Sequence, residues 1–396
     1  MQDSIQYKKR TLHLAEKLLF YGFLATGLFL PTYIGINVGV NLSPLRILFI
    51  FLLPLLFFRL KAIPQSKFLL YALLFCLYLA ISSVLVTGSF TGITYSLYFF
   101  EMGVAGFLVS SLYFKYLSDN NFFNFLVTGF FMIFFFFILE QSTGQKVLSG
   151  FITSESSAAD RLSDLSMRFE NIRATSIFKS SYAFAQVLCT YIIIFMFFLT
   201  RKRRAIIYTI FSILIFMLFA TYTRSMIILG VLIFFYFFIN RFKQKSILGF
   251  FSFLFIALIT FFSLQSILQL FTIDASSDLR IEQYSFLYTS FMTADYFTVL
   301  FGYGPYTTSD NPYYFIDNLY LMFFYEFGIF GLLLLLLYFY QLGKIFYKSK
   351  LLLAYLVNLG IFTITGTLES LFLLNIIAGY VYSRKFYVSP AEGPLT

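Results

Sequence analysis

Long apolar runs, separated by short basic clusters, follow one another along almost the whole sequence. Several runs reach the roughly 20 residues that an α-helix needs to cross the hydrocarbon core of a bilayer. The runs are continuous, whereas the strands of a membrane β-barrel alternate apolar and polar residues, so that fold is excluded. The pattern predicts an all-α integral membrane protein, a single polytopic domain (1–396) with about 12 transmembrane helices and two larger periplasmic loops. The expected spans are Leu18–Ile36, Leu45–Phe58, Phe68–Val86, Ile93–Phe114, Phe122–Leu139, Tyr182–Leu199, Ala205–Ala220, Met226–Ile239, Ile247–Leu270, Asn318–Tyr340, Leu351–Thr365 and Leu371–Ser383.

Basic residues orient these spans, because positive charge collects in the cytoplasmic loops of membrane proteins. The strongest cluster, Arg201–Arg204, follows the sixth span. A topology with both termini in the cytoplasm places all but eight of the 28 Lys and Arg residues on the inner side. The net charge of +10 is therefore an orientation signal rather than a sign of nucleic-acid binding, and we expect a multi-pass membrane protein with both termini in the cytoplasm. The eight outer residues are Arg46, Lys146, Arg161, Arg168, Arg173, Lys179, Arg224 and Arg280.

Two polar stretches, residues 140–180 and 271–317, are the predicted periplasmic loops. The sequence contains only three Cys and His side chains that could take part in metal or redox chemistry. Cys76 and Cys189 both lie in apolar segments, and the single histidine, His13, lies in a basic N-terminal tail. These side chains do not form the ligand sets of zinc, haem or iron–sulfur sites. No metal and no cofactor is therefore expected.

Four arginines face outward at or near the membrane surface in this topology: Arg168, Arg173, Arg224 and Arg280. A guanidinium group presents a planar fork of donors that matches phosphate oxygens in pairs, and it stays charged at physiological pH. The alternative for each arginine is a weak pair with a local carboxylate. Arg224 is unusual because it lies in a very short outer hairpin. The alternative to phosphate binding there is a side chain that extends to the lipid headgroups.

Carboxylates on the outer side are candidates for the base that takes a proton from a hydroxyl group. Asp317 directly precedes the tenth span, so it is also a candidate N-cap of that helix. Glu326 and Glu101 lie inside apolar runs, where an ionisable group is costly and a function or a specific partner is expected. The other outer carboxylates considered are Glu140, Asp295, Asp310 and Glu369.

Gly302 and Gly304 form a G-x-G that predicts a turn. No strand precedes it and no third glycine follows, so it is not a dinucleotide-binding fingerprint. Tyrosines crowd the same loop. Their rings could stack on sugars, but tyrosine also anchors proteins at the membrane interface, and the chain has no tryptophan for that role.

Three stretches together resemble the superfamily of O-antigen polymerases and O-antigen ligases. Residues Arg173–Ala185 are similar to the family pattern R-x-x-G-x-x-x-x-P-N-x-x-A, although Ser176 stands where glycine is usual. Residues Thr221–Ser225 look like the family's S-x-S-R-G hairpin. In Leu279–Gly331 an arginine, a G-x-G, an Asp-Asn pair and an E-x-G-x-x-G helix follow in the family's order.

The resemblance implies a glycosyltransferase of the bacterial cytoplasmic (inner) membrane that needs neither metal nor nucleotide. The donor is a growing glycan on undecaprenyl pyrophosphate, and the acceptor is a single lipid-linked repeat unit. The product is an O-antigen, a capsule or a related surface glycan. We expect catalytic roles for Asp317, Arg224, Arg280 and Glu326, and substrate-binding roles for Arg173, Arg168, Gly302, Gly304 and Asn318. Tyr303 joins the substrate-binding candidates because tyrosines crowd its loop.

Ligases of this family usually carry a histidine where Asp317 stands, so the resemblance favours a Wzy-type polymerase. Two alternatives remain: an O-antigen ligase, and a flippase or other transporter of lipid-linked oligosaccharides. Transporters often contain paired halves with broken helices at the midplane, and we find no such pairing in the sequence. The implied partners are membrane lipid, undecaprenyl-pyrophosphate-linked glycans, a chain-length regulator and a flippase, without nucleic acid.

Overall fold

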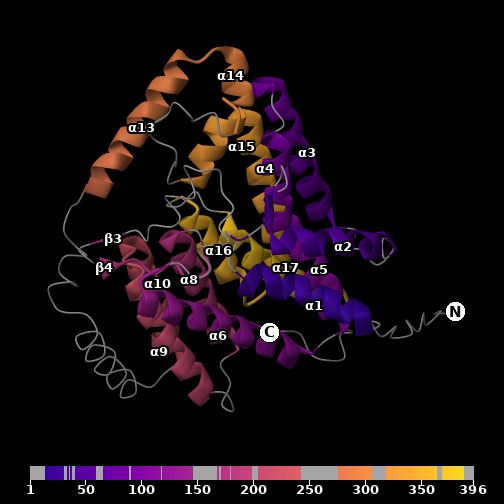
Figure 1. Ribbon diagram of the computed structural model, residues 1–396, viewed down its shortest axis with the longest axis vertical. Helices are drawn as coiled ribbons and strands as arrows, with labels where there is room; N and C mark the ends of the chain where they lie inside the picture. Colours follow the sequence, from indigo (N-terminus) through magenta and orange to yellow (C-terminus); the bar gives the residue numbers. More distant parts are fainter. Residues whose placement is uncertain are drawn as a thin grey trace.

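The fold is described from a computed structural model (Figure 1). The described residues are 14–30, 34, 36–37, 41–58, 66–88, 91–116, 118–145, 167–168, 171–178, 180–198, 204–241, 275–305, 318–363 and 368–387.

The described part of the chain is helical apart from two hairpins of two-residue strands. In the first hairpin, β1 (Ile36–Asn37) pairs with β2 (Asn41–Leu42), and in the second, β3 (Met167–Arg168) pairs with β4 (Asn171–Ile172), both antiparallel. The helices are α1 (Leu14–Phe29), α2 (Pro44–Phe58), α3 (Lys67–Thr87), α4 (Thr91–Phe100), the π-helix η2 (Glu101–Ala105), α5 (Gly106–Tyr113), the 3₁₀-helix η3 (Phe114–Tyr116), α6 (Asp119–Thr143), α8 (Ser181–Phe197), α9 (Arg204–Ala220), α10 (Arg224–Arg241), α13 (Ala275–Thr293), α14 (Tyr296–Phe301), α15 (Leu319–Phe346), α16 (Leu352–Ile361) and α17 (Glu369–Tyr387).

Most of the predicted spans coincide with helices, and the all-α class holds for the described residues. By length and composition alone, four helical segments could cross a membrane, namely Lys67–Thr87, Ile93–Tyr113, Asp119–Thr143 and Leu319–Phe346. The last of these is divided by non-helical backbone at Gly328. The count of about 12 spans stays a prediction, since only four candidate segments are identified among the described residues and the ninth span, Ile247–Leu270, lies outside them. The first span was placed too far along the chain, because α1 ends at Phe29 and Ile36 belongs to a hairpin.

Serine side chains set the starts of three of these helices. Ser66, Ser118 and Ser180 each accept a hydrogen bond from the backbone N–H three residues later, which satisfies one of the free donors of a first helical turn. The apolar runs therefore become helices that begin at defined residues.

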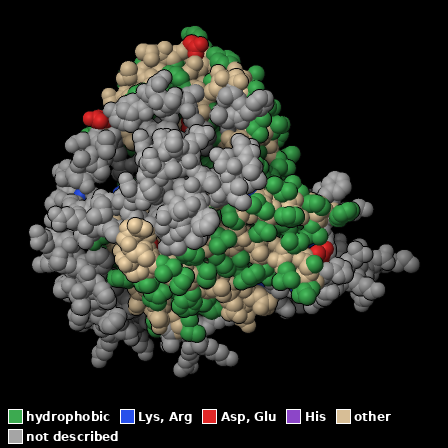
Figure 2. Space-filling model, in the orientation of Figure 1, with side chains coloured by type: hydrophobic (Ala, Val, Ile, Leu, Met, Phe, Trp, Pro, Cys, Tyr) green, Lys and Arg blue, Asp and Glu red, His purple; other side chains and the backbone are tan. Residues whose placement is uncertain are grey.

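The core consists mainly of aromatic and aliphatic side chains from helices that are distant in sequence. Helix α8 is almost completely enclosed, which places it at the centre of the described bundle. Figure 2 shows hydrophobic side chains over much of the described surface as well, including the edge formed by α3. A molecule that is apolar both inside and outside is typical of a membrane protein, because lipid covers the outer surface.

Buried polar side chains join the helices at two levels. The Asn358 amide nitrogen donates to Thr190 Oγ1 at 2.9 Å and its oxygen accepts from Gln186 Nε2 at 3.1 Å, so α16 is tied to α8. The Tyr338 hydroxyl donates to the Gly103 carbonyl at 2.8 Å and accepts from Asn375 Nδ2 at 2.9 Å. The first link holds α16, and through it the start of α15, next to the first turns of α8.

Helix α15 is two helices joined by a reversal of the chain at Gly328, where φ is 66° and ψ is −167°. The Tyr320 and Phe339 rings lie 6.0 Å apart, although 19 residues of straight helix would separate them by about 28 Å. Both Phe323 and Tyr338 contact the Phe75 ring of α3. The predicted tenth span, Asn318–Tyr340, is therefore wrong as a single straight helix.

Gly302, at the end of α14, packs against the backbone of α15 directly before the reversal. It ends α14 with φ 83° and ψ −177°, and a Cβ atom there would overlap the backbone at Glu326. In return, a Cβ atom at Gly328 would overlap the backbone at Leu300. The two glycine backbones are thus in direct contact with each other's helix. Figure 1 shows the result, with α15 between the α13–α14 edge and the α3–α4 edge.

We expect Gly302→Ala and Gly328→Ala each to destabilise the protein by roughly 3 kcal/mol or more, because only glycine adopts this backbone conformation readily and a methyl group overlaps backbone atoms. Thermal unfolding in detergent measures the effect. The matched control is Gly360→Ala in α16, where an added Cβ meets nothing within 4 Å. Melting temperatures that agree for all three variants would contradict the interlocked reversal.

Candidate functional site

The structure brings two of the three family-like stretches together, although about 50 residues separate them. The Ala174 N–H donates to the Ala220 carbonyl at 2.9 Å. The Arg173 guanidinium donates from Nε to the Thr221 carbonyl and from Nη2 to Thr223 Oγ1, both at 3.3 Å. The extended segment that begins at Arg173 therefore lies along the hairpin between α9 and α10.

The same hairpin carries Arg224, which is the first residue of α10 and is half-buried. Thr223 closes the start of that helix, since its carbonyl accepts from the Ile227 N–H at 2.9 Å. An arginine at this end adds positive charge to the positive end of the helix dipole, which is unfavourable unless an anion is near. The Arg173 guanidinium is hydrogen-bonded to Thr221 and Thr223 of the same hairpin, so this end of α10 is a candidate anion site.

Glu140, at the end of α6, holds the segment after Arg173 in place. Its buried carboxylate accepts from the Thr175 N–H at 2.9 Å, from the Ser176 N–H at 2.6 Å and from the Thr175 hydroxyl. Charge-assisted hydrogen bonds of this kind are about twice as strong as neutral ones. Glu140 was considered only as one of several outer carboxylates, and its structural role could not be read from the sequence.

Ser176 has a backbone conformation that explains the family's glycine. Its φ is 49°, in the left-handed region that glycine occupies without strain. Here the Ser176 hydroxyl donates to the Ile133 carbonyl of α6 at 2.9 Å, which offsets part of the cost. The departure from the family pattern at this position is compatible with the same backbone path.

The Arg173 guanidinium also lies over the Tyr182 ring, with 5.3 Å between the guanidinium carbon and the ring centroid. A cation above an aromatic face is held by the ring quadrupole. Together with the two hydrogen bonds to the hairpin, this contact fixes the direction of the side chain. Arg173 is thus held in place before any ligand binds.

The Asp317-Asn318 pair is expected to cap the helix through Asp317, and this expectation is wrong. The N-cap is Asn318, whose Oδ1 accepts from the Leu321 N–H at 3.1 Å. Asn318 Nδ2 donates to the Thr363 carbonyl at 3.0 Å, just beyond α16. Asp317 itself lies outside the described residues. Because Asn318 performs the capping, this structural explanation for Asp317 no longer applies.

Asn318 and Arg173 belong to the same region of the bundle. The end of α16 holds the start of α15, because the Leu319 N–H donates to the Phe362 carbonyl at 2.9 Å. Asn358, in the last turn of α16, bonds to Gln186 in the second turn of α8. Helix α8 begins directly after the segment that carries Arg173. The segment that carries Arg173 and the helix start at Asn318 are therefore both close in the chain or in space to the hydrogen bond between Asn358 and Gln186.

Glu326 lies at the other end of the first half of α15, directly before the reversal. Eight residues of helix separate it from Asn318, a rise of about 12 Å. Its carbonyl accepts from the Gly304 N–H at 2.9 Å, and its side chain is half-buried. The structure thus separates Glu326 from Asn318 at the start of the helix.

The G-x-G is a turn, as predicted, but its tyrosine is used inside the protein. The Tyr303 hydroxyl donates to the Ser290 carbonyl of α13 at 2.6 Å, and its ring stacks on Tyr325 at 4.7 Å between centroids. Partial burial raises the pKa of the Tyr303 phenol, and the charge of Asp295 adds to this effect. Tyr303 therefore joins α13, α14 and α15, and a role in binding sugar stays a prediction.

Two of the predicted arginines are placed only by their backbones. Arg168 lies in β3 and Arg280 in the second turn of α13, and both side chains lie outside the described part. In Figure 1 the start of α13 and the β3–β4 hairpin appear on the same side of the view. Their roles stay predictions.

Glu101 has the specific partner that its apolar surroundings led us to expect. Arg46 Nε lies 2.5 Å from Glu101 Oε1, and Arg46 Nη2 lies 3.1 Å from Oε2. Glu101 begins the π-helix η2, where the irregular turn also frees the Gly103 carbonyl for Tyr338. This ion pair joins α2 to η2 inside the bundle.

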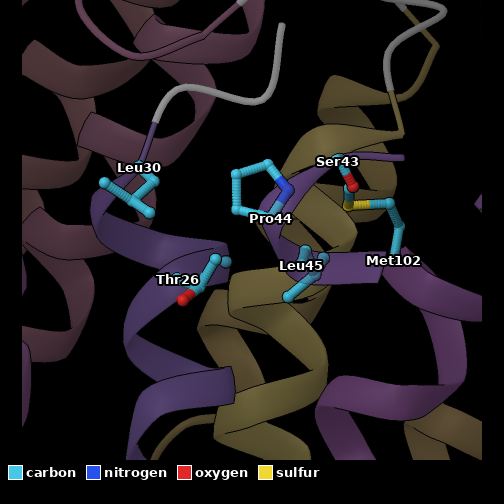
Figure 3. Close-up of a pocket in the computed structure, with 7 residues that line it drawn as sticks. Thr26, Leu30, Ser43, Pro44, Leu45 and Met102 are labelled. Carbon is cyan, nitrogen blue, oxygen red and sulfur yellow. The ribbon is translucent and has the colours of Figure 1, made fainter. Parts of the chain in front are cut away.

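A cavity lies beside that ion pair, between α1, α2 and η2 (Figure 3). It is lined by Thr26, Gly27, Leu30, Ser43, Pro44, Leu45 and Met102, with a volume of about 20 Å³. This space is enough for about one water molecule and too small for a sugar. Among the described residues no group of three or more His, Cys, Asp or Glu side chains is placed to hold a metal ion.

Comparison with known proteins gives one match. A protein-family model described as O-antigen ligase matches residues 209–336. The matched segment includes the hairpin with Arg224, the G-x-G and the two halves of α15 up to residue 336, whereas Arg173 lies before it. No curated protein and no solved structure matches the chain.

We expect Glu140→Ala to destabilise the protein by roughly 3 kcal/mol, because buried donors of Thr175 and Ser176 lose a charged acceptor. Glu140→Gln keeps the size and one acceptor oxygen, so its effect should be smaller. Thermal unfolding in detergent measures both variants, with Glu282→Gln on the exposed face of α13 as the control. If Glu140→Ala melts with the wild type, the carboxylate does not hold this segment.

Proposed function

We propose that this chain, which belongs to the O-antigen polymerase/ligase superfamily through residues 209–336, is a polysaccharide polymerase. It joins oligosaccharide repeat units linked to undecaprenyl pyrophosphate on the periplasmic side of the inner membrane. The observation that carries the proposal is the pair of hydrogen bonds between Arg173 and the hairpin that bears Arg224. This contact joins the segment of one motif to the hairpin of another, which supports one anion site formed by both arginines.

The reaction needs an anion site and little else, because the donor sugar is already activated. A hydroxyl oxygen of the acceptor attacks the anomeric carbon of the donor and forms the new glycosidic bond. The bond from that carbon to the pyrophosphate oxygen breaks, and undecaprenyl pyrophosphate leaves with the electron pair. The hydroxyl proton passes to a base, for which we propose Asp317.

Arg173 and Arg224 would bind the pyrophosphate of the donor and stabilise the charge that it gains as it leaves. Donors fixed in advance are effective in this role because they need no rearrangement during the reaction. Arg173 meets this condition, since Thr221, Thr223 and Tyr182 hold its side chain. The α10 dipole adds further positive potential at the same point.

The choice between polymerase and ligase depends on the missing histidine. The only histidine of the chain is His13, in the basic N-terminal segment. Ligases of the family usually use a histidine at the position of Asp317 to activate the acceptor, and here that position offers a carboxylate. This difference supports the polymerase, and the ligase is the second candidate because the matching family model bears its name.

Transport of lipid-linked oligosaccharides is the remaining alternative. The reversal at Gly328 resembles the broken helices of transporters, which place helix ends at a central binding site. Here, however, the interlocked glycines and the half-helix are packed against α14 by backbone contacts. Such packing supports a rigid scaffold for catalysis better than an alternating one.

We expect Arg224→Lys to abolish most polymerisation while the protein stays in the membrane, because lysine cannot present the planar fork to phosphate oxygens. Polymer length in a deletion strain complemented with the variant measures this. Arg241→Lys, at the opposite end of the same helix, is the matched control. An Arg224→Lys protein as active as the wild type would restrict Arg224 to contact with lipid headgroups.

We expect Asp317→Asn to fold normally, because Asn318 caps the helix, and to lose the capacity to accept a proton at neutral pH. Single lipid-linked repeat units should then accumulate on the outer face of the membrane. A flippase with this variant would leave them on the cytoplasmic face, and a ligase would leave finished polymer on its lipid. The purified protein with lipid-linked repeat units gives the direct assay.

The control for this assay is Asp295→Asn, an exposed carboxylate that caps α14. Asparagine is as good a cap as aspartate, so its activity should match the wild type. Equal rates of glycan extension by Asp317→Asn and the wild type would exclude Asp317 as the base.

A further inference from the structure

Helix α13 has two exposed faces of opposite character. One consists of large apolar or aromatic side chains, of which Ile281 is 67% exposed, Tyr288 66% and Met292 68%. Tyr284 belongs to the same stripe. The other exposed stripe is polar and consists of Glu282, Ser285, Thr289 and Thr293.

The geometry of the helix explains how both stripes remain exposed. At 3.6 residues per turn each residue advances by about 100°, so residues 281, 284, 288 and 292 share a sector of about 80°. The polar residues fill the adjacent sector. The rest of the circumference packs against the protein through Leu287 and its neighbours Phe286 and Phe291, which contact Tyr325 of α15.

The apolar stripe continues into exposed apolar surface of α14 and of the second half of α15. Tyr296 and Phe297 of α14 are exposed beyond it, and the Phe301 ring lies 5.6 Å from Phe330. Phe330 and Leu333 are exposed apolar residues of the half of α15 that follows the reversal at Gly328. The same kind of surface therefore extends from α15 over α14 to α13.

We propose that α13 is an interfacial helix whose stripe Ile281–Tyr284–Tyr288–Met292 is inserted in the membrane at the boundary of headgroups and acyl chains. A helix with one apolar and one polar exposed face takes this position because each face then meets its preferred medium. Two of the four stripe residues are tyrosines, the aromatic residues that this tryptophan-free chain has available for the interface. The occupant of the face is bilayer lipid.

This arrangement sets the depth of the helix as well as its direction. The backbone of Arg280 precedes the stripe by one residue, so it lies near the level of the lipid phosphates. A link between that position and the binding of a lipid pyrophosphate rests on the proposed function. The membrane contact of α13 does not.

Tryptophan fluorescence tests the proposal directly, because the chain has no tryptophan of its own. Tyr288→Trp places a probe on the apolar stripe, and Thr289→Trp places the matched control one residue further, on the polar stripe. Each purified protein is reconstituted in phosphatidylcholine–phosphatidylglycerol vesicles with brominated acyl chains. Iodide added to non-brominated vesicles measures exposure to water.

We expect brominated lipid to quench Tyr288→Trp several-fold more than Thr289→Trp, and iodide to quench them in the opposite order. Equal quenching of both by iodide would overturn the proposal, because the stripe would then face water. Protection of Tyr288→Trp from both quenchers would overturn it too, because a protein surface such as a second copy would cover the stripe. Met292→Trp repeats the measurement on the same stripe if Tyr288→Trp does not fold.

Discussion

The reversal at Gly328 is the constraint on which the positions of the site residues depend. It turns one apolar run into two packed helices, so that the first half of α15 starts beside Phe339 and the end of α16 instead of at the end of a straight span. The reversal is maintained because Gly302 fits against Glu326 and Gly328 fits against Leu300. Asn318 consequently lies beside the end of α16, which Asn358 ties to α8, and the G-x-G and E-x-G-x-x-G elements act as one structural unit.

The position of Arg173 beside the α9–α10 hairpin depends on a second buried interaction, between Glu140 and the segment after Arg173. The carboxylate fixes the backbone at Thr175 and Ser176, and the hairpin fixes the guanidinium of Arg173. Under the proposed function, the guanidinium groups of Arg173 and Arg224 and the N-terminus of α10 would face the same ligand, and their like charges would repel one another. A dianionic group such as a pyrophosphate relieves this repulsion, which is a physical reason for an anion to bind there and for its leaving to be stabilised.

The helices could be predicted from the sequence, because an apolar run and a serine cap are local features. The reversal could not, since Gly328 is one of several glycines in apolar runs and its backbone angles depend on the contact with α14. Capping by Asn318 rather than Asp317 likewise depends on the Thr363 carbonyl, which no local pattern reveals. The order of motifs did indicate Arg173 and Arg224, but their proximity arises from packing of the segment along the α9–α10 hairpin. Tyr303 was singled out for sugar binding because tyrosines crowd its loop, whereas the structure uses both its ring and its hydroxyl to join three helices.

Helix α13 is another element whose position could not be predicted from the sequence, because it lacks the long apolar run of a membrane-spanning segment. Its average composition is polar enough to resemble a soluble loop helix, since serine, threonine and glutamate fill one of its three sectors. Only the packing of Leu287 and Phe291 on α15 shows which sector faces the protein. Once that sector is known, the remaining apolar and polar stripes are both exposed and need different media. The boundary between bilayer and water supplies both, and it is also where a lipid pyrophosphate carries its charge. The membrane therefore belongs to the physical description of this fold as much as any side-chain contact does.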